Sequence, residues 1–260
     1  MITKHFYGDV ILRFSVFPTL LLTTCLLLSI SSKGKQTITF GTGIFPPGNV
    51  IDPETGRCSG RLIDTVNKIF TESDFRLKFI CTTPGRIYRM IENGEIDLTV
   101  NVTATAQLNG MITFIKPPYR DLNISLFKHQ DIKQSKIISA VRGYQYNGQR
   151  KQLQEQGFEF YDLPDTVSAL RFFMKKRRAY LLSYRAPIIY MPNQNATSDK
   201  HHLVEEKVSS LTTYFAISNK SKMFDIIKNV FKSYITKHDR KYFLDDDTTK
   251  LYLGENGVTI

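Results

Sequence analysis

In the first third of the chain, segments whose apolar side chains have the spacing of a β-strand alternate with segments whose apolar side chains have the spacing of a helix. Residues 37–43 and 75–82 are short β-type runs, and residues 95–102 alternate regularly between apolar and polar side chains. Residues 60–70 and 85–94 carry their apolar side chains at helical spacing. This β-α-β-α-β order predicts an α/β fold with helices on the faces of a sheet.

A second set of elements of the same kind follows later in the chain. Asp165 is a typical N-cap residue, and it opens a helix whose predicted inward side chains are Val167, Leu170 and Met174. The remaining pattern predicts strands at 136–143, 158–163 and 178–185, and helices at 147–157, 165–176 and 222–237.

Two such units predict two lobes joined by extended segments. We expect the chain to cross between them at residues 123–130 and 212–219, with the last helix packed on the first lobe. The first lobe is then 36–124 plus 217–260, and the second is 125–216. Ligands bind outside the carboxyl ends of strands in open α/β sheets, so two facing lobes predict a ligand cleft between them.

The N-terminus has the pattern of a secretory signal. Basic residues precede an apolar run interrupted by Pro18, and small residues follow at Ser29 and Ser31. We expect residues 1–31 to be a signal peptide and the mature protein to be soluble and periplasmic. An uncleaved membrane anchor is the alternative.

Two cysteines, Cys58 and Cys81, remain in the exported part of the chain. An even number in an oxidising compartment favours one disulfide. Cys58 directly precedes the first helix and Cys81 ends the second strand, so both lie at the same edge of the first lobe. Two buried free thiols are the alternative.

The net charge and the motifs of the chain limit the classes of function that it can have. The formal net charge of +11 favours anionic ligands or a membrane surface, but a solvated basic surface is the simpler interpretation. Nothing resembles a nucleic-acid-binding module. No nucleophile and base are paired, and His201 with His202 has no third metal ligand. We therefore expect a protein that is not an enzyme and that has no cofactor, metal or catalytic residue.

Several motifs in order resemble one known family. A Pro-Pro loop follows the first strand, "ETG" and "SGR" lead into the first helix, and "NGEID" and "TFIKPPY" precede the crossing. Over about residues 36–250 the chain is similar to the family 3 extracytoplasmic solute-binding proteins of bacterial amino-acid ABC transporters. The resemblance implies the two-lobed type II periplasmic binding protein fold, with two crossover strands and a ligand cleft.

The same resemblance shows that two charges are missing. Family members that bind amino acids grip the ligand carboxylate with an Arg six residues before the Phe of the last motif. That Phe corresponds to Phe114, and Leu108 stands at the Arg position. The Asp that holds the ligand ammonium corresponds to Tyr184. The resemblance therefore implies a ligand other than a free amino acid.

Candidate ligand contacts are the residues at the predicted strand ends and loops around the cleft. Arg142 and Tyr144 follow a strand of the second lobe, where Arg offers a planar fork for an anion and Tyr offers apolar area with a polar tip. Each candidate has a structural alternative, such as loop packing for Phe45 or an exposed helix start for Arg86. The candidates are Phe45, Arg86, Asn101, Thr103, Tyr119, Arg142, Tyr144 and Tyr184.

We expect a monomeric binding protein that captures a small polar or anionic organic ligand for an ABC permease. The alternatives are a sensory or envelope binding protein without a transporter, and a dehydratase-type enzyme on the same fold.

Overall fold

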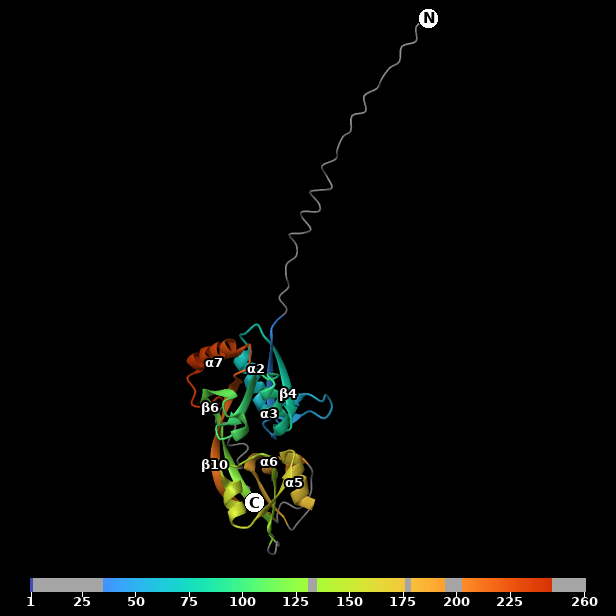
Figure 1. Ribbon diagram of the computed structural model, residues 1–260, viewed down its shortest axis with the longest axis vertical. Helices are drawn as coiled ribbons and strands as arrows, with labels where there is room; N and C mark the ends of the chain where they lie inside the picture. The colour runs from blue at the N-terminus through green and yellow to red at the C-terminus, as the bar shows by residue number, and fades with distance from the viewer. Residues whose placement is uncertain (2–34, 131–134, 176–178, 195–202, 245–260) are drawn as a thin grey trace. The chain divides into compact units, whose positions relative to one another are not determined.

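The structure is a computed structural model of the 260-residue chain, and it describes Met1 and residues 35–130, 135–175, 179–194 and 203–244. The chain divides into two compact units, 1–35 and 36–260, and every helix and strand of the described residues lies in the second (Figure 1). The predicted signal segment lies outside the described residues, apart from Met1. Within the described residues, no helix is long and apolar enough to cross a membrane.

One eight-stranded sheet runs through the second unit in the order β4-β1-β5-β10-β6-β9-β7-β8. Parallel pairing joins β1 to β4 and β5 at one end, and β7 to β8 and β9 at the other. The strands are β1 Thr37–Gly43, β4 Arg76–Thr82, β5 Leu98–Val102, β6 Ile112–His129, β7 Ile137–Val141, β8 Glu159–Leu163, β9 Tyr180–Tyr184 and β10 Leu203–Ser218. A separate pair, β2 Val50–Ile51 and β3 Cys58–Ser59, lies in the loop after β1.

Helices cover the two ends of this sheet and define two lobes. Helices α2 Arg61–Phe70, α3 Pro84–Glu92 and α7 Phe224–His238 belong to the first lobe. Helices α4 Gln149–Glu155, α5 Thr166–Lys175 and α6 Arg185–Gln194 belong to the second. Figure 1 shows β6 and β10 running side by side from one group of helices to the other. The two-lobed α/β architecture with two crossover strands is as predicted.

The crossover itself is a two-stranded ribbon. Strand β5 pairs with β10 through Thr213–Ile217, and β9 pairs with β6 through Ile124–Phe127. Between them, residues 120–123 of β6 pair only with residues 210–213 of β10. Most of the predicted crossing segment 123–130 instead pairs inside the second lobe, where Ile124–Phe127 pair with β9. The predicted lobe boundaries at 124/125 and 216/217 lie near the ribbon and stay a prediction.

The buried face of α5 differs from the predicted one. It consists of Thr166, Ala169, Leu170 and Phe173, whereas Val167 and Met174 are only half-buried. Phe173 on this face is fully buried, and its ring is stacked on that of His129 with 4.5 Å between the ring centroids. The predicted N-cap is confirmed, because the Ser168 N–H donates to Asp165 Oδ1 at 2.7 Å.

Helix α6 and most of β6 were not expected from the sequence. The crossing was predicted to begin at residue 123, yet β6 already starts at Ile112 and contains the "TFIKPPY" motif. Two prolines favour a loop in this segment, but Pro117 and Pro118 lie where β6 pairs with no residue of β10.

Cys58 and Cys81 form a disulfide, which is the pairing that the sequence favoured, with their Cα atoms 5.7 Å apart. The bridge joins β3 to the end of β4. The Leu62 N–H donates to the Gly48 carbonyl at 2.9 Å, so the start of α2 holds the same loop. The loop between β1 and α2, which carries Phe45, is therefore fastened to the first lobe at two points.

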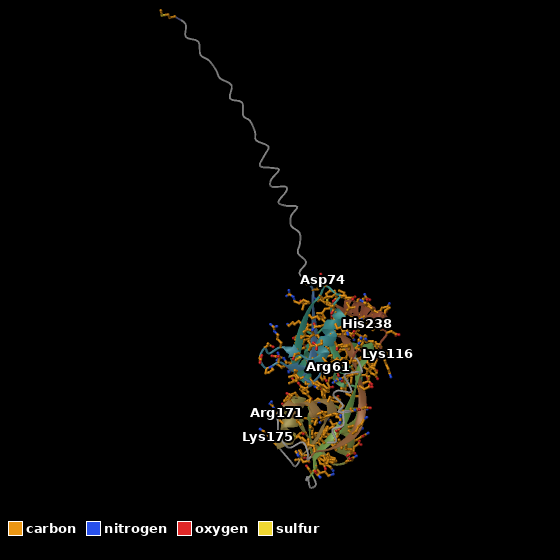
Figure 2. The ribbon with its side chains drawn as sticks, turned by 180° about the vertical axis from the view of Figure 1, so that it is seen from behind. Arg61, Asp74, Lys116, Arg171, Lys175 and His238 are labelled. Carbon is orange, nitrogen blue, oxygen red and sulfur yellow. A yellow bond between two sulfur atoms is a disulfide. The ribbon has the colours of Figure 1, made fainter. Side chains whose placement is uncertain are left out.

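The positive charge is spread over solvated surface. Lys116, Arg171 and Lys175 are all exposed (Figure 2). The densest run of basic residues in the sequence is Lys175–Arg178, and of these only Lys175 lies within the described residues.

Candidate ligand-binding site

A cavity of about 100 Å³ lies where the two lobes meet the crossover ribbon. The first lobe contributes the ends of β1 and β5 and the loop after β1, and the second contributes residues 143–147 and the end of β9. This is the edge of the sheets at which the sequence predicted a cleft.

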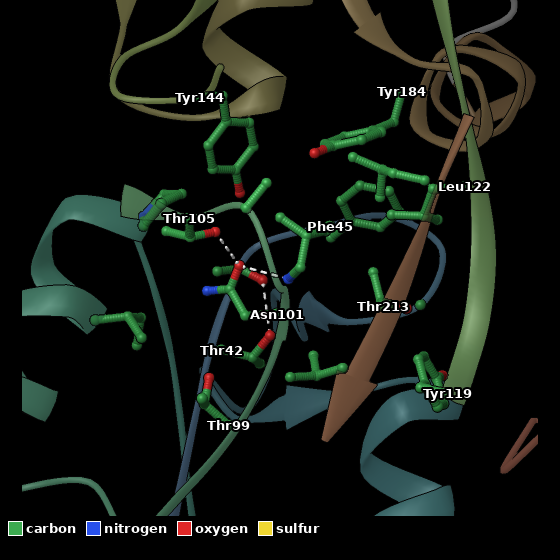
Figure 3. A pocket seen from close by; sticks show the side chains of 18 of the residues that line it. Thr42, Phe45, Thr99, Asn101, Thr105, Tyr119, Leu122, Tyr144, Tyr184 and Thr213 are labelled. Carbon is green, nitrogen blue, oxygen red and sulfur yellow. Dashed lines mark hydrogen bonds between the residues drawn. The ribbon is translucent and has the colours of Figure 1, made fainter. Parts of the chain in front are cut away.

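Aromatic rings form the second-lobe side of the cavity. Tyr144 and Tyr184 lie 5.9 Å apart between ring centroids, and Tyr146 lies 5.7 and 5.6 Å from them. Phe45 reaches across from the first lobe to 5.3 Å from the Tyr184 ring (Figure 3). Burial raises the pKa of Tyr144, Tyr146 and Tyr184 far above that of a free phenol, so all three stay neutral.

Hydroxyl and amide groups form the first-lobe side, which Figure 3 shows facing the tyrosines. Asn101 Oδ1 accepts hydrogen bonds from Thr105 Oγ1 and the Val102 N–H, both at 2.8 Å. The side-chain oxygen of Asn101 is therefore engaged inside the protein, and its NH₂ group is the donor that it can offer. Burial raises the pKa of Tyr88, which also lines the cavity, so its phenol stays neutral.

Among the described residues, one cationic side chain, Arg120, belongs to the lining. It precedes Leu122 by two residues on β6, so both side chains lie on the same face of the strand, and both line the cavity. Its guanidinium carbon lies 5.2 Å from the Phe45 ring centroid and 5.8 Å from that of Tyr119. Burial lowers the pKa of Arg120, which nevertheless keeps its charge at neutral pH.

No carboxylate neutralises Arg120 within the described part of the chain. The ion pairs of these residues involve other cations, and the cavity lining that they form contains neither Asp nor Glu. The site therefore carries a positive charge on a half-buried side chain, which contacts the faces of two aromatic rings.

The structure brings together five of the eight predicted contact residues. Phe45, Asn101, Tyr119, Tyr144 and Tyr184 all belong to the lining. Tyr119 is mainly a core residue of the first lobe, with 3% of its surface exposed and its ring 5.3 Å from that of Phe215.

The other three predicted residues, Arg86, Thr103 and Arg142, are exposed and are not part of the lining. For Arg142 the reason is the strand end: its N–H donates to the Leu163 carbonyl at 2.8 Å, and its side chain turns to solvent before the loop enters the cavity. In this structure Arg142 therefore does not line the cavity.

Sequence reasoning missed Arg120 and Tyr88. Arg120 directly follows the Pro-Pro-Tyr motif, and extending the crossing strand back to this motif would have placed it two residues before Leu122, on one face. Leu108, at the family's Arg position, is 2% exposed in an apolar cluster with Ile87 and Ile112 and does not line the cavity.

No family model matches the chain, and the comparison with curated proteins gives no match. Solved structures do match. A histidine kinase sensor domain with similarity to periplasmic binding proteins aligns with a TM-score of 0.66 and 16% identity, over 85% of this chain and 97% of that one. The substrate-binding protein of an ABC uptake transporter from Streptococcus pneumoniae, with bound histidine, also aligns with a TM-score of 0.66 and 16% identity, over 86% and 95%.

The arginine-bound form of truncated ArgBP from T. maritima aligns with a TM-score of 0.61 and 16% identity, over 77% of this chain and 95% of that one. These three neighbours are binding proteins or a sensor domain rather than enzymes. The chain therefore has the fold of the two-lobed periplasmic binding proteins, which confirms the fold that the sequence predicted.

Proposed function

We propose that this chain is an extracytoplasmic solute-binding protein related to family 3, which captures a small organic anion between its lobes and delivers it to an ABC permease. The observation that carries the proposal is the half-buried Arg120 side chain, which lines the cavity without a carboxylate partner among the described residues. We expect the mature protein to be periplasmic and monomeric.

A charge that is partly removed from water and has no ionic partner carries part of a desolvation cost, and an anionic ligand offsets that cost. A charge taken fully out of water without a partner costs several kcal/mol, and a charged hydrogen bond restores about 1.5–3 kcal/mol. The planar guanidinium can bind a carboxylate through two parallel hydrogen bonds. Arg120 thus takes the anchoring role that the sequence assigned to Arg142.

The lining also indicates which anions fit. A free amino acid brings an ammonium group, and the described lining residues offer no carboxylate to receive it. Tyr184, at the family's Asp position, presents a neutral phenol instead. A flat or apolar body would contact Phe45 and Tyr144, with Asn101 as a donor to a second polar group. The proposed ligand is therefore a small monoanion without an amine.

A sensory role is the second candidate. One structural neighbour is a sensor domain of a histidine kinase, and the same cleft could report a ligand instead of delivering it. Uptake of the labelled ligand by cells with and without the gene separates the two: a transport protein is needed for uptake, and a sensor is not.

Native mass spectrometry of freshly purified mature protein tests the ligand class. We expect a co-purified small acid that is absent from Arg120→Met and retained by the matched control Arg142→Met, whose side chain is exposed. Calorimetry with benzoate as a probe and with the standard amino acids follows. Micromolar affinity for any standard amino acid, or loss of the ligand from Arg142→Met alone, would contradict the proposal.

A further inference from the structure

The loop of residues 142–148, here called the ligand loop, carries Tyr144 into the cavity and contacts the first lobe. An added Cβ at Gly43 would lie 3.6 Å from the Tyr144 hydroxyl, and one at Gly143 would lie 3.5 Å from Gln107 Nε2. Gly43 and Gln107 both belong to the first lobe. The position of the ligand loop therefore determines both the shape of the site and the fit of the lobes.

This loop has an irregular backbone that helix or strand hydrogen bonds do not hold. Gly143, Tyr146, Asn147 and Gly148 all have positive φ angles, of 79°, 50°, 55° and 82°. Two of these residues, Tyr146 and Asn147, are not glycine, and a left-handed backbone is unfavourable for residues that carry a Cβ. The surrounding structure must therefore hold the loop in place.

Arg150 supplies that hold from beneath the loop. It lies in α4 and is 8% exposed. Its Nε donates to the Tyr144 carbonyl at 2.9 Å, and its Nη2 donates to the Val141 carbonyl at 3.0 Å. Nη2 also donates to Asp162 Oδ1 at 2.8 Å, so one guanidinium joins the ligand loop, the end of β7 and β8.

Other groups around Arg150 complete the arrangement. The Phe160 ring lies under the guanidinium, 4.4 Å from centroid to carbon. The Val141 N–H donates to the Tyr146 hydroxyl at 2.9 Å, which turns the Tyr146 side chain back under the loop. At the far end, Asn147 Nδ2 donates to Ser209 Oγ at 2.9 Å, on β10 beside the crossover ribbon.

We propose that Arg150, held by Asp162, is a positioning residue of the ligand site. It fixes the Tyr144 carbonyl and so presents the Tyr144 ring to the cavity before any ligand arrives. Arg150 itself does not line the cavity. A buried charge is energetically costly, and an apolar residue could fill the same space. The planar guanidinium, however, can donate to two carbonyls and a carboxylate at once, which an apolar residue cannot do. The effect on affinity rests on the proposed function, whereas the effect on the loop does not.

Hydrogen–deuterium exchange of the ligand-free protein tests the loop directly. The variants are Arg150→Lys, which keeps the charge but loses the fork, and Asp162→Asn, a milder change in case the first does not fold. The control is Leu153→Ala, which empties a buried position of the same helix and leaves the Arg150 contacts in place.

We expect Arg150→Lys to raise exchange at residues 142–148 by about tenfold or more, because a hydrogen bond to a charged group typically contributes that much. Exchange in the first lobe should not change. Leu153→Ala should raise exchange broadly over the second lobe without singling out the loop. Unchanged loop exchange in both Arg150→Lys and Asp162→Asn, or a rise spread evenly over the second lobe, would overturn the proposal.

Binding gives a second measurement. If the wild-type protein binds benzoate or its co-purified acid, Arg150→Lys should weaken that binding more than Leu153→Ala does at an equal loss of melting temperature. Equal weakening by the two would mean that Arg150 acts only through stability. If the wild type binds no anion at all, the proposed function is wrong, and the exchange measurement still decides the role of Arg150.

Discussion

Replacing Arg120 by Met should have different effects on the free and the liganded protein. Met keeps an apolar chain over the Phe45 and Tyr119 rings but removes the charge. In the free protein, the loss of a cation–π interaction worth about 0.5–2 kcal/mol is set against relief of a desolvation penalty of about the same size, because Arg120 is only half-buried. The free variant should therefore stay within about 1 kcal/mol of the wild type, which corresponds to about 2–4 °C in Tm.

In the presence of ligand, the Arg120→Met variant should be less stable than the wild type. Loss of a charged hydrogen bond weakens binding by about 10- to 150-fold. At a ligand concentration of about 100 times the wild-type Kd, the wild type gains about 2.7 kcal/mol, or roughly 5–10 °C in Tm. A variant that binds about 100-fold more weakly gains only about 0.4 kcal/mol under the same conditions, roughly 1 °C.

Differential scanning calorimetry with and without the co-purified acid measures both effects in one series. Arg142→Met removes the same charge from an exposed position and should stay within about 0.5 kcal/mol of the wild type in either state. If Arg120→Met keeps the full shift in Tm on ligand addition, Arg120 does not bind the anion. If the free variant is clearly less stable than the wild type, Arg120 is a structural residue instead.

Three further predictions concern stability. Replacing both Cys58 and Cys81 by Ser should lower the free energy of unfolding by about 3 kcal/mol, measured in urea, because the bridge closes a loop with a sequence separation of 23. Burial raises the pKa of Tyr144, so above about pH 10 only the unfolded state loses that proton, and stability should fall by about 1.4 kcal/mol per pH unit for this group. Tyr144→Phe should remove that part of the alkaline slope, and an unchanged slope would contradict the assigned burial. Gly60→Ala should cost about 2–4 kcal/mol, because φ is 114° and the new Cβ would lie 2.7 Å from the Gly48 carbonyl oxygen. Gly56→Ala, with φ of 66° and open space around it, should cost about 1 kcal/mol in the same urea titration.

The fold was predictable because its elements have strong local patterns. The apolar side chains of residues 60–70 lie at helical spacing, and α2 forms there with the expected residues buried. The last helix also follows its pattern, with Ile227, Phe231 and Tyr234 buried. In both helices a single face packs against the core, so the spacing of apolar residues in the sequence directly indicates which side chains are buried.

The pattern failed where both faces of an element are covered. Thr99 lies on the polar side of the alternation in residues 95–102, yet it is 1% exposed and belongs to the cavity lining. Its hydroxyl donates to the Gly41 carbonyl at 2.7 Å, which satisfies the group without water. Alternation of apolar and polar residues cannot distinguish a solvated face from a buried face whose polar groups are paired.

The position of the proposed anion anchor, Arg120, could not be read from strand ends, because this residue belongs to the crossover ribbon. At the family's Arg position, Leu108 packs into an apolar cluster, so a charge there would have to displace core contacts. Arg120 instead lies on β6 where this strand pairs only with β10, and its backbone carbonyl accepts from Thr213 Oγ1 at 2.8 Å. Its guanidinium faces the Phe45 ring, which reaches Tyr184 of the second lobe. An anion bound at Arg120 would therefore contact the crossover ribbon. Through Phe45, which contacts both Arg120 and Tyr184, it could also change how the first lobe packs against the second.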